Sequence, residues 1–235
     1  MKQIVSTLKY IVLSFVLLLS ATGCVDIIPE RDVLRQPETY TLDLSALPEI
    51  LTIVNTPTSV GTIDGNGLRM ASGPKTNLFN NPNGQSNVHS APMALFQPEG
   101  DFVLRARVRP HLEAVYDVAA LVVYFDDQRW AKLCFENSVK KQPTVVSVVT
   151  RGLSDDCNSQ SIDADSVYLS LARKGDHYSM HWSLDGSQWD MVRDFNLKGR
   201  GTLKAGFAVH GSRGSGTWAE FTEIQYTPNA PEAMR

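Results

Sequence analysis

Apolar and polar side chains alternate one by one along several segments of the chain from residue 101 onward. In residues 102–109 the core-type positions include Phe102 and Leu104, and the intervening positions include Arg105 and Arg107. The same period of two recurs in residues 130–136, 145–151, 178–184 and 203–210. Successive side chains of a β-strand point to opposite faces, so this pattern is typical of strands with one buried face. Beyond the first two dozen residues, no segment shows a sustained helical period.

Turn signals separate these segments. Residues 64–67 read Asp-Gly-Asn-Gly, and an Asp185-Gly186 pair ends another alternating run, as expected of hairpins. Residues 119–125 form an apolar run, which favours a strand covered on both sides. The stretch from about residue 46 to about residue 100 is broken by Gly, Asn and Pro and predicts short, irregular strands. Many short strands between turns indicate an all-β antiparallel sandwich, with a barrel as the open alternative.

The first 23 residues have the features of an export signal. Lys2 and Lys9 give a positive start, an apolar run follows over residues 11–19, and small residues precede Cys24. The apolar run is too short for a membrane-spanning helix, which needs roughly 20 residues. The small residues before Cys24 resemble the lipobox of bacterial lipoproteins, although Ala21 stands where leucine is more usual. We expect lipidation of Cys24, palmitate included; cleavage nearby with Cys24 as an incidental thiol is the alternative.

The chain then divides into four expected parts. Residues 1–23 are the signal, residues 24–45 a lipidated N-terminus and tether, residues 46–227 the sandwich, and residues 228–235 a C-terminal tail. The residue after Cys24 is Val25 and not aspartate, which resembles the default for sorting to the outer membrane of a Gram-negative cell. We therefore expect a membrane-anchored protein of the cell envelope.

Charge and cysteine content exclude several classes of function. The chain has 22 Lys and Arg against 25 Asp and Glu, without a basic run, so nucleic acid is not an expected partner. Cys134 and Cys157 are predicted not to form a structural disulfide, and neither has the spacing of a zinc site. Oxygen ligands for calcium occur between Asp155 and Asp165, but their spacing favours a polar turn. No cofactor is expected.

Several of these segments resemble a known family. Residues 101–108, 116–121, 130–136, 146–156 and 183–189, and more weakly 73–77, resemble a bacterial and fungal family of domains of unknown function named after a yeast "regulation of enolase protein". The resemblance implies a jelly roll similar to concanavalin A-like lectins and glucanases, with one concave sheet face, and it implies little about activity. Val118 and Ala120 stand where that family usually has glutamine and glycine.

The arrangement of carboxylates disfavours a hydrolase. Glycosidases hold two carboxylates about 5 to 9.5 Å apart across a sugar ring. Glu136 is the one carboxylate in the middle of a clear strand, and Asp126-Asp127 and Asp155-Asp156 are expected in turns. A lyase would need a base and a cation, which His181, His210, Lys132 and Arg151 offer in principle. For each histidine, a solvated strand position is the simpler interpretation.

Polar groups in the non-core phase of several strands favour sugar binding. If the strands pair in register, these groups form a mixed field of donors and acceptors, with Trp130 as an aromatic platform at its edge and an Arg151–Glu136 pair within it. An ordinary polar face with weak ion pairs is the competing interpretation. The predicted ligand-binding residues are Trp130, Lys132, Glu136, Ser147, Arg151, His181 and His210.

The sequence thus predicts a membrane-tethered, non-catalytic, lectin-like domain whose partners are a glycan and, through the lipid, a membrane. A carbohydrate-active hydrolase or lyase with an unrecognised site is the first alternative. An envelope adaptor protein is the second, and it should present a flat apolar patch.

Overall fold

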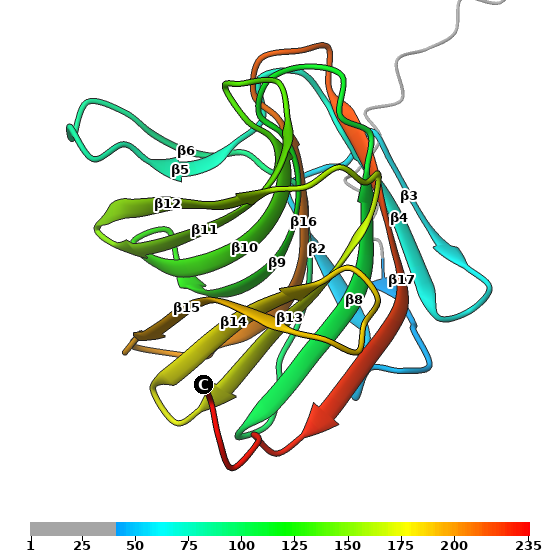
Figure 1. Cartoon of the computed structure of the whole chain (residues 1–235), viewed down its shortest axis with the longest axis vertical. Helices are drawn as coiled ribbons and strands as arrows, with labels where there is room; N and C mark the ends of the chain where they lie inside the picture. The colour runs from blue at the N-terminus through cyan, green and yellow to red at the C-terminus, as the bar shows by residue number, and fades with distance from the viewer. Residues whose placement is uncertain (1–40) are drawn as a thin grey trace, which may run out of the picture. The chain divides into compact units, whose positions relative to one another are not determined.

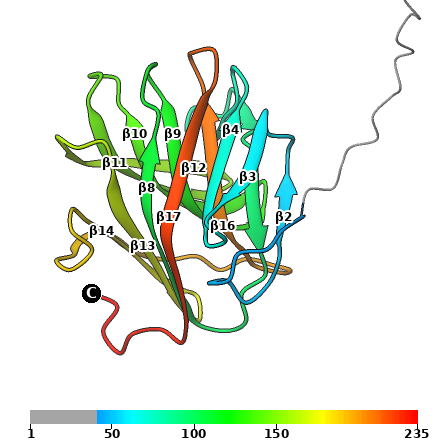
Figure 2. The same ribbon diagram turned by 90° about the vertical axis from the view of Figure 1, so that its right-hand side faces the viewer.

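The computed structural model describes residues 41–235, a single all-β unit of two packed antiparallel sheets and one separate hairpin. The prediction of an antiparallel jelly-roll sandwich is confirmed. Figures 1 and 2 show the two layers, with β8, β17, β4 and β3 in front in Figure 2 and β9, β10 and β16 behind them. No helix long and apolar enough to cross a membrane occurs in residues 41–235. Cys24 lies outside the described residues.

Sheet A has eight strands. In spatial order they are β1 (Thr41–Leu42), β2 (Leu51–Val54), β7 (Met93–Phe96), β16 (Lys204–Gly211), β9 (Asp117–Asp126), β10 (Arg129–Asn137), β11 (Pro143–Arg151) and β12 (Leu153–Ser161). The central strand β9 is buried on both faces, as its apolar sequence predicts: Leu121 packs between the sheets and Val122 on the other side.

Sheet B has seven strands, and a two-stranded hairpin stands apart from both sheets. The order in sheet B is β15 (Asp190–Asn196), β14 (His177–Ser183), β13 (Val167–Lys174), β8 (Phe102–Pro110), β17 (Thr217–Pro228), β4 (Gly67–Ser72) and β3 (Ser59–Ile63). The hairpin consists of β5 (Leu78–Asn80) and β6 (Asn87–His89). The predicted turn between β3 and β4 is present, with Asp64 and Gly65 both at positive φ, the backbone that Asp-Gly pairs favour.

Side chains from both sheets form the main core. Phe135 of sheet A and Phe102 of sheet B are fully buried in it, and Phe207 packs on Phe221 across the two sheets with ring centroids 4.9 Å apart. Leu44 is also fully buried, so the sandwich includes residues before the predicted start at residue 46. Near the C-terminus, Met234 packs against sheet B.

Candidate functional site

The face of sheet A that points away from sheet B carries a second apolar cluster. Val118, Trp130 and Val148 belong to it, together with Leu78 of the β5–β6 hairpin, and Phe79 packs against it. Figure 1 shows the hairpin beside the outer strands of this sheet. The hairpin therefore covers part of a face that the alternating sequence alone would assign to solvent.

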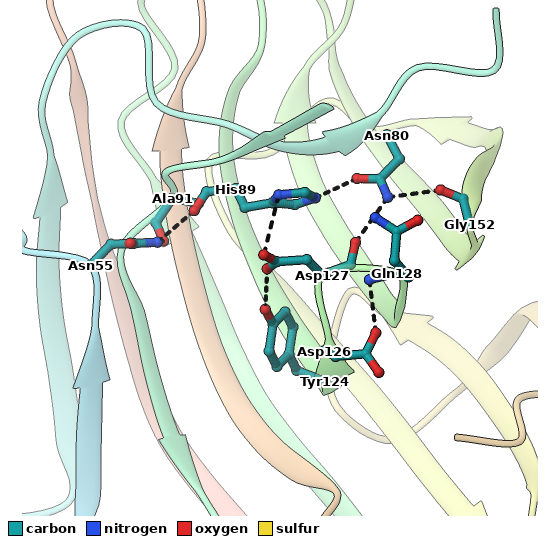
Figure 3. Close-up of polar contacts among 9 residues, drawn as sticks. All are labelled: Asn55, Asn80, His89, Ala91, Tyr124, Asp126, Asp127, Gln128 and Gly152. Carbon is teal, nitrogen blue, oxygen red and sulfur yellow. Dashed lines mark hydrogen bonds and ion pairs between the residues drawn. The ribbon is translucent and has the colours of Figure 1, made fainter. Parts of the chain in front are cut away.

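Asn80 fixes the hairpin to the sheet. It is fully buried, and its amide nitrogen donates to the carbonyl oxygens of Asp127 and Gly152 at 2.9 and 2.8 Å. Because that nitrogen is a donor, the other atom of the amide group is the oxygen, which accepts from His89 Nε2 at 2.6 Å. The Nδ1 atom of His89 lies 3.6 Å from the Asp127 carboxylate (Figure 3). Tyr124 donates its hydroxyl hydrogen to the same carboxylate. The hairpin is thus held by directional contacts that centre on the buried side chain of Asn80.

A pocket of about 380 Å³ opens between the hairpin, the sheet face and two loops. Its size is in the range of small-molecule sites. The sheet contributes Val118, Lys132, Glu136, Val148, Asp156 and His210. The hairpin and the chain beside it contribute Asn77, Phe79, Asn81, Ser86 and Val88. The loops contribute Tyr116, Ser212 and Arg213.

Lys132 and His210 meet on the pocket floor. Each is at most 3% exposed, and Lys132 Nζ lies 3.0 Å from His210 Nε2. An ammonium group only donates, so Nε2 is the acceptor and the ring proton is on Nδ1, which lies 3.4 Å from the Ser212 hydroxyl. Burial, and then the charge of Lys132, hold the pKa of His210 well below its usual range. The imidazole is therefore neutral.

Glu136 is 8% exposed and lies in the same cross-strand row as His210, with Val118 of β9 between them. Burial raises the pKa of Glu136 to about 7, against the opposing effect of Lys132 and with a further contribution from Asp156. Its protonation state therefore changes near neutral pH.

Asp156 faces the same pocket from the edge strand β12. Burial also raises its pKa, while Lys132 lowers it. Asp156 is aligned with Val148 and Lys132, four residues along the strands from the row of Glu136. Ordinary strand spacing then places the Cα atoms of the two acidic residues roughly 16 Å apart. The prediction that Asp155 and Asp156 lie in a turn is wrong, because β12 continues through both.

The structure brings three of the predicted site residues together, namely Lys132, Glu136 and His210. Trp130 is not an exposed platform: its side chain is fully buried in the apolar cluster beneath the hairpin. Ser147 is also fully buried and points the other way, since the register pairs it with Leu133, which belongs to the core between the sheets.

Arg151 and His181 lie outside the pocket. Arg151 pairs with Arg129 at the far end of the β10–β11 hairpin and donates to the carbonyl oxygen of Asn196, so the predicted contact with Glu136 is wrong. His181 belongs to β14 in sheet B, opposite Ser170. The register, which sequence periodicity does not fix, explains the error for Arg151. His181 was misplaced because periodicity does not show which of the two sheets a strand joins.

Most of the pocket wall escaped sequence analysis. The hairpin residues lie in a stretch that reads as a polar loop, and Arg213 lies in the glycine-rich run 211–216. Tyr116 adopts a positive φ of 65° just before β9, and the Arg213 guanidinium lies 5.9 Å from the centroid of its ring. Neither the hairpin stretch nor the glycine-rich run has a strand-like period, so the sequence pattern did not indicate that these segments lie beside Lys132.

The two described cysteines are both free, Cys134 buried and Cys157 exposed. The register places them two strands apart, with Cys157 opposite Ser147 and Cys134 opposite Val146, whose side chains point to opposite faces. Within residues 41–235, no group of three or more His, Cys, Asp or Glu side chains is arranged to hold a metal ion.

These features define a jelly-roll β-sandwich with a polar pocket under a hairpin. The chain belongs to the family described as "Protein of unknown function (DUF1349)", whose model matches residues 53–229. No protein of curated function matches the chain. That this family is the one named after the yeast "regulation of enolase protein" stays a prediction.

Solved structures share the fold. A protein of unknown function from Saccharomyces cerevisiae is 22% identical, with a TM-score of 0.69 over 78% of this chain and 97% of the yeast one. A GH43 protein from Bacillus licheniformis is 16% identical, with a TM-score of 0.60 over 76% of this chain and 37% of its own. The GH43B protein of a Bacteroides ovatus xyloglucan locus is 16% identical, with a TM-score of 0.61 over 83% of this chain and 40% of its own. This chain spans less than half of either GH43 protein, and the likeness is one of fold.

Proposed function

We propose that the protein is a membrane-tethered, non-catalytic, sugar-binding protein that uses the pocket between sheet A and the β5–β6 hairpin. The observation that supports this most is the pocket lining, where Lys132, Glu136 and Asp156 face a common space without pairing with one another within ion-pair distance. Sugar hydroxyls both donate and accept, so they are suited to groups of this kind. The rings of Phe79 and Tyr116 add apolar surface for sugar C–H groups.

The separation of the acidic residues supports a binding role over hydrolysis. Glycosidases bring two carboxyl groups within about 5 to 9.5 Å. Here β11 separates the strands of Glu136 and Asp156, and the two residues are also offset along the strands. The chain shares its fold with parts of two GH43 proteins, which supports a role connected with carbohydrates.

A blocking variant tests the pocket. Ser86 is an exposed hairpin residue that lines it, and Ser86→Trp would place an indole in the cavity without altering the floor. We expect the purified full chain to lose at least about tenfold in affinity for its glycan on a screened panel, roughly 1.4 kcal/mol, while the melting curve is unchanged. Arg151→Ala is the matched control outside the pocket and should bind normally. A Ser86→Trp protein that binds as wild type does would place the site elsewhere.

The anchor is tested separately. Cys24→Ser should release the mature protein from membranes or leave the signal uncleaved, because the thiol that takes the lipid is gone. Mass spectrometry and membrane fractionation give the readout. Unchanged membrane association with a normal mature mass would exclude a lipid on Cys24 as the anchor.

A second candidate function is an enzyme acting on glycans. It is favoured by Glu136, because a carboxyl group whose pKa is about 7, in a pocket that also holds a neutral histidine, suits general acid–base chemistry. Release of reducing ends or of unsaturated sugars from any glycan by the wild-type protein, lost in Glu136→Gln, would replace the non-catalytic assignment.

A further inference from the structure

The ammonium group of Lys132 is buried with unused hydrogen-bonding capacity. It carries three donors, and among residues 41–235 its one contact with a polar atom is that to His210. That partner is neutral, and no carboxylate of residues 41–235 forms an ion pair with Nζ. Removing an ammonium from water costs several kcal/mol unless an anion compensates it. Glu136 and Asp156 act on this charge only from beyond ion-pair distance, and the Trp130 ring lies 5.8 Å from Nζ on the apolar side. Two donors and a positive charge without a directly paired anion therefore face the pocket.

The other unpaired groups of the wall are mainly donors too. The amide oxygen of Asn77 accepts from the backbone of Leu78, and that of Asn81 accepts from the backbone of Asn83, so both side chains offer their NH₂ groups. The Arg213 guanidinium adds further donors and a second positive charge at the exposed rim. A ligand that matches this lining must be rich in acceptors.

Two acidic side chains oppose an anion, but only weakly. Asp156 lies on the edge strand, where water reaches it even though partial burial raises its pKa. Glu136 takes up a proton near neutral pH, and in that form it becomes a donor instead of a second negative charge. With Glu136 protonated, Lys132 and Arg213 outweigh Asp156 in the pocket.

Resting on the proposed function, we infer that the pocket binds an anionic sugar unit, with a carboxylate or sulfate group of the sugar on the Lys132 ammonium and in reach of Arg213. The sugar hydroxyls then meet the amide groups of Asn77 and Asn81. A carboxylate or sulfate supplies the acceptors and the charge that the protein leaves out, through charge-assisted hydrogen bonds.

Matched sugar pairs test this inference by calorimetry with the full chain at mildly acidic pH. The pairs are glucuronate with glucose and galacturonate with galactose, and a sulfate ester of glucose separates the two anionic sources. We expect at least one anionic member to bind about tenfold or more tighter than its neutral partner. Lys132→Met, which keeps the apolar stem, should remove that preference. Lys204→Met, on the same sheet but outside the pocket, should leave it intact.

The outcomes separate the two proposals. Equal binding of neutral and anionic sugars in the pocket would overturn the anionic ligand and leave sugar binding standing. Binding of no sugar would overturn both. If Lys132→Met fails to fold, the variant Arg213→Gln at the exposed rim provides the test. The inference requires that its preference for the anionic over the neutral sugar be about threefold lower than that of wild type. An unchanged preference in Arg213→Gln would then overturn the inference.

Discussion

The outer faces of the two sheets look alike in sequence and differ in the structure. Both carry charged side chains at alternate positions of their strands. On sheet B, Glu220 accepts from Arg69 at 3.2 Å and from Arg109 at 2.5 Å, and both arginines are about half exposed, at 51% and 43%. On sheet A, Lys132 and Glu136 are nearly buried and do not pair with each other.

What covers the face accounts for this difference. The β5–β6 hairpin lies over sheet A and removes its polar groups from bulk water, while in residues 41–235 the outer face of sheet B has Met234 packed near one end. On the solvated face of sheet B the charged groups pair with one another. Around the covered cavity on sheet A the charged groups do not pair with one another, so their hydrogen-bonding capacity remains available to a ligand. Alternation in a sequence identifies the polar face of a strand, and it does not say whether another segment covers it.

The largest expected effect comes from loosening the cover. Asn80→Ala would leave the carbonyl groups of Asp127 and Gly152 without their buried donor (Figure 3). Each orphaned group costs about 1 to 3 kcal/mol, so we expect a loss of about 4 kcal/mol in the free energy of unfolding and a fall of roughly 10 °C in Tm. Glycan affinity should fall as well, because the hairpin supplies one wall of the pocket. Urea denaturation and calorimetry measure both effects.

Asn87→Ala is the matched control for this variant. Asn87 lies opposite Asn80 in the same hairpin and is exposed. It should change stability by less than about 0.5 kcal/mol. A similar loss from both variants would mean that the hairpin is sensitive to any change, and Asn80 would have no special anchoring role.

The sequence predicted the two-sheet fold well because burial of one strand face leaves a period-two pattern. It also predicted the pocket residues Lys132 and Glu136, since both lie on one well-defined strand. It failed for Arg151 and Ser147 because strand register depends on contacts across the sheet. It failed for Trp130 because the residues that bury it come from the irregular segment around Leu78, which has no period to read.

A smaller effect on stability, of opposite sign, is expected at Glu136. The pKa of this carboxyl is about 7 in the folded protein and 4.5 ordinarily, so the folded state favours the protonated form. As pH rises from about 4.5 through 7, the free energy of unfolding of the wild type falls, whereas a variant with an uncharged side chain at position 136 does not show this fall. Glu136→Gln should therefore be roughly 2–3 kcal/mol more stable than wild type at about pH 8 and equal to it at about pH 4.

Urea unfolding of both proteins across this pH range gives the measurement. The charged and titratable groups that face Glu136 from the pocket are Lys132, Asp156, His210, Tyr116 and Arg213. Of these, Asp156 also has a raised pKa, so Asp156→Asn is examined in parallel to separate its contribution. A stability difference between wild type and Glu136→Gln that does not vary with pH would contradict the raised pKa.

The smallest effect is expected on the exposed face of sheet B. Glu220→Gln removes the negative charge shared by Arg69 and Arg109. Both arginines still contact water and the Trp218 ring, whose centroid lies 4.2 Å from the guanidinium carbon of Arg69 and 5.3 Å from that of Arg109. Exposed ion pairs contribute about 0–1 kcal/mol, and salt screens them. We expect a loss below about 1 kcal/mol that shrinks further in high salt, with glycan binding unchanged. If Glu220→Gln instead weakened binding as much as Lys132→Met, the ligand would be held by sheet B, and the contrast between a covered, functional face and a solvated one would be reversed.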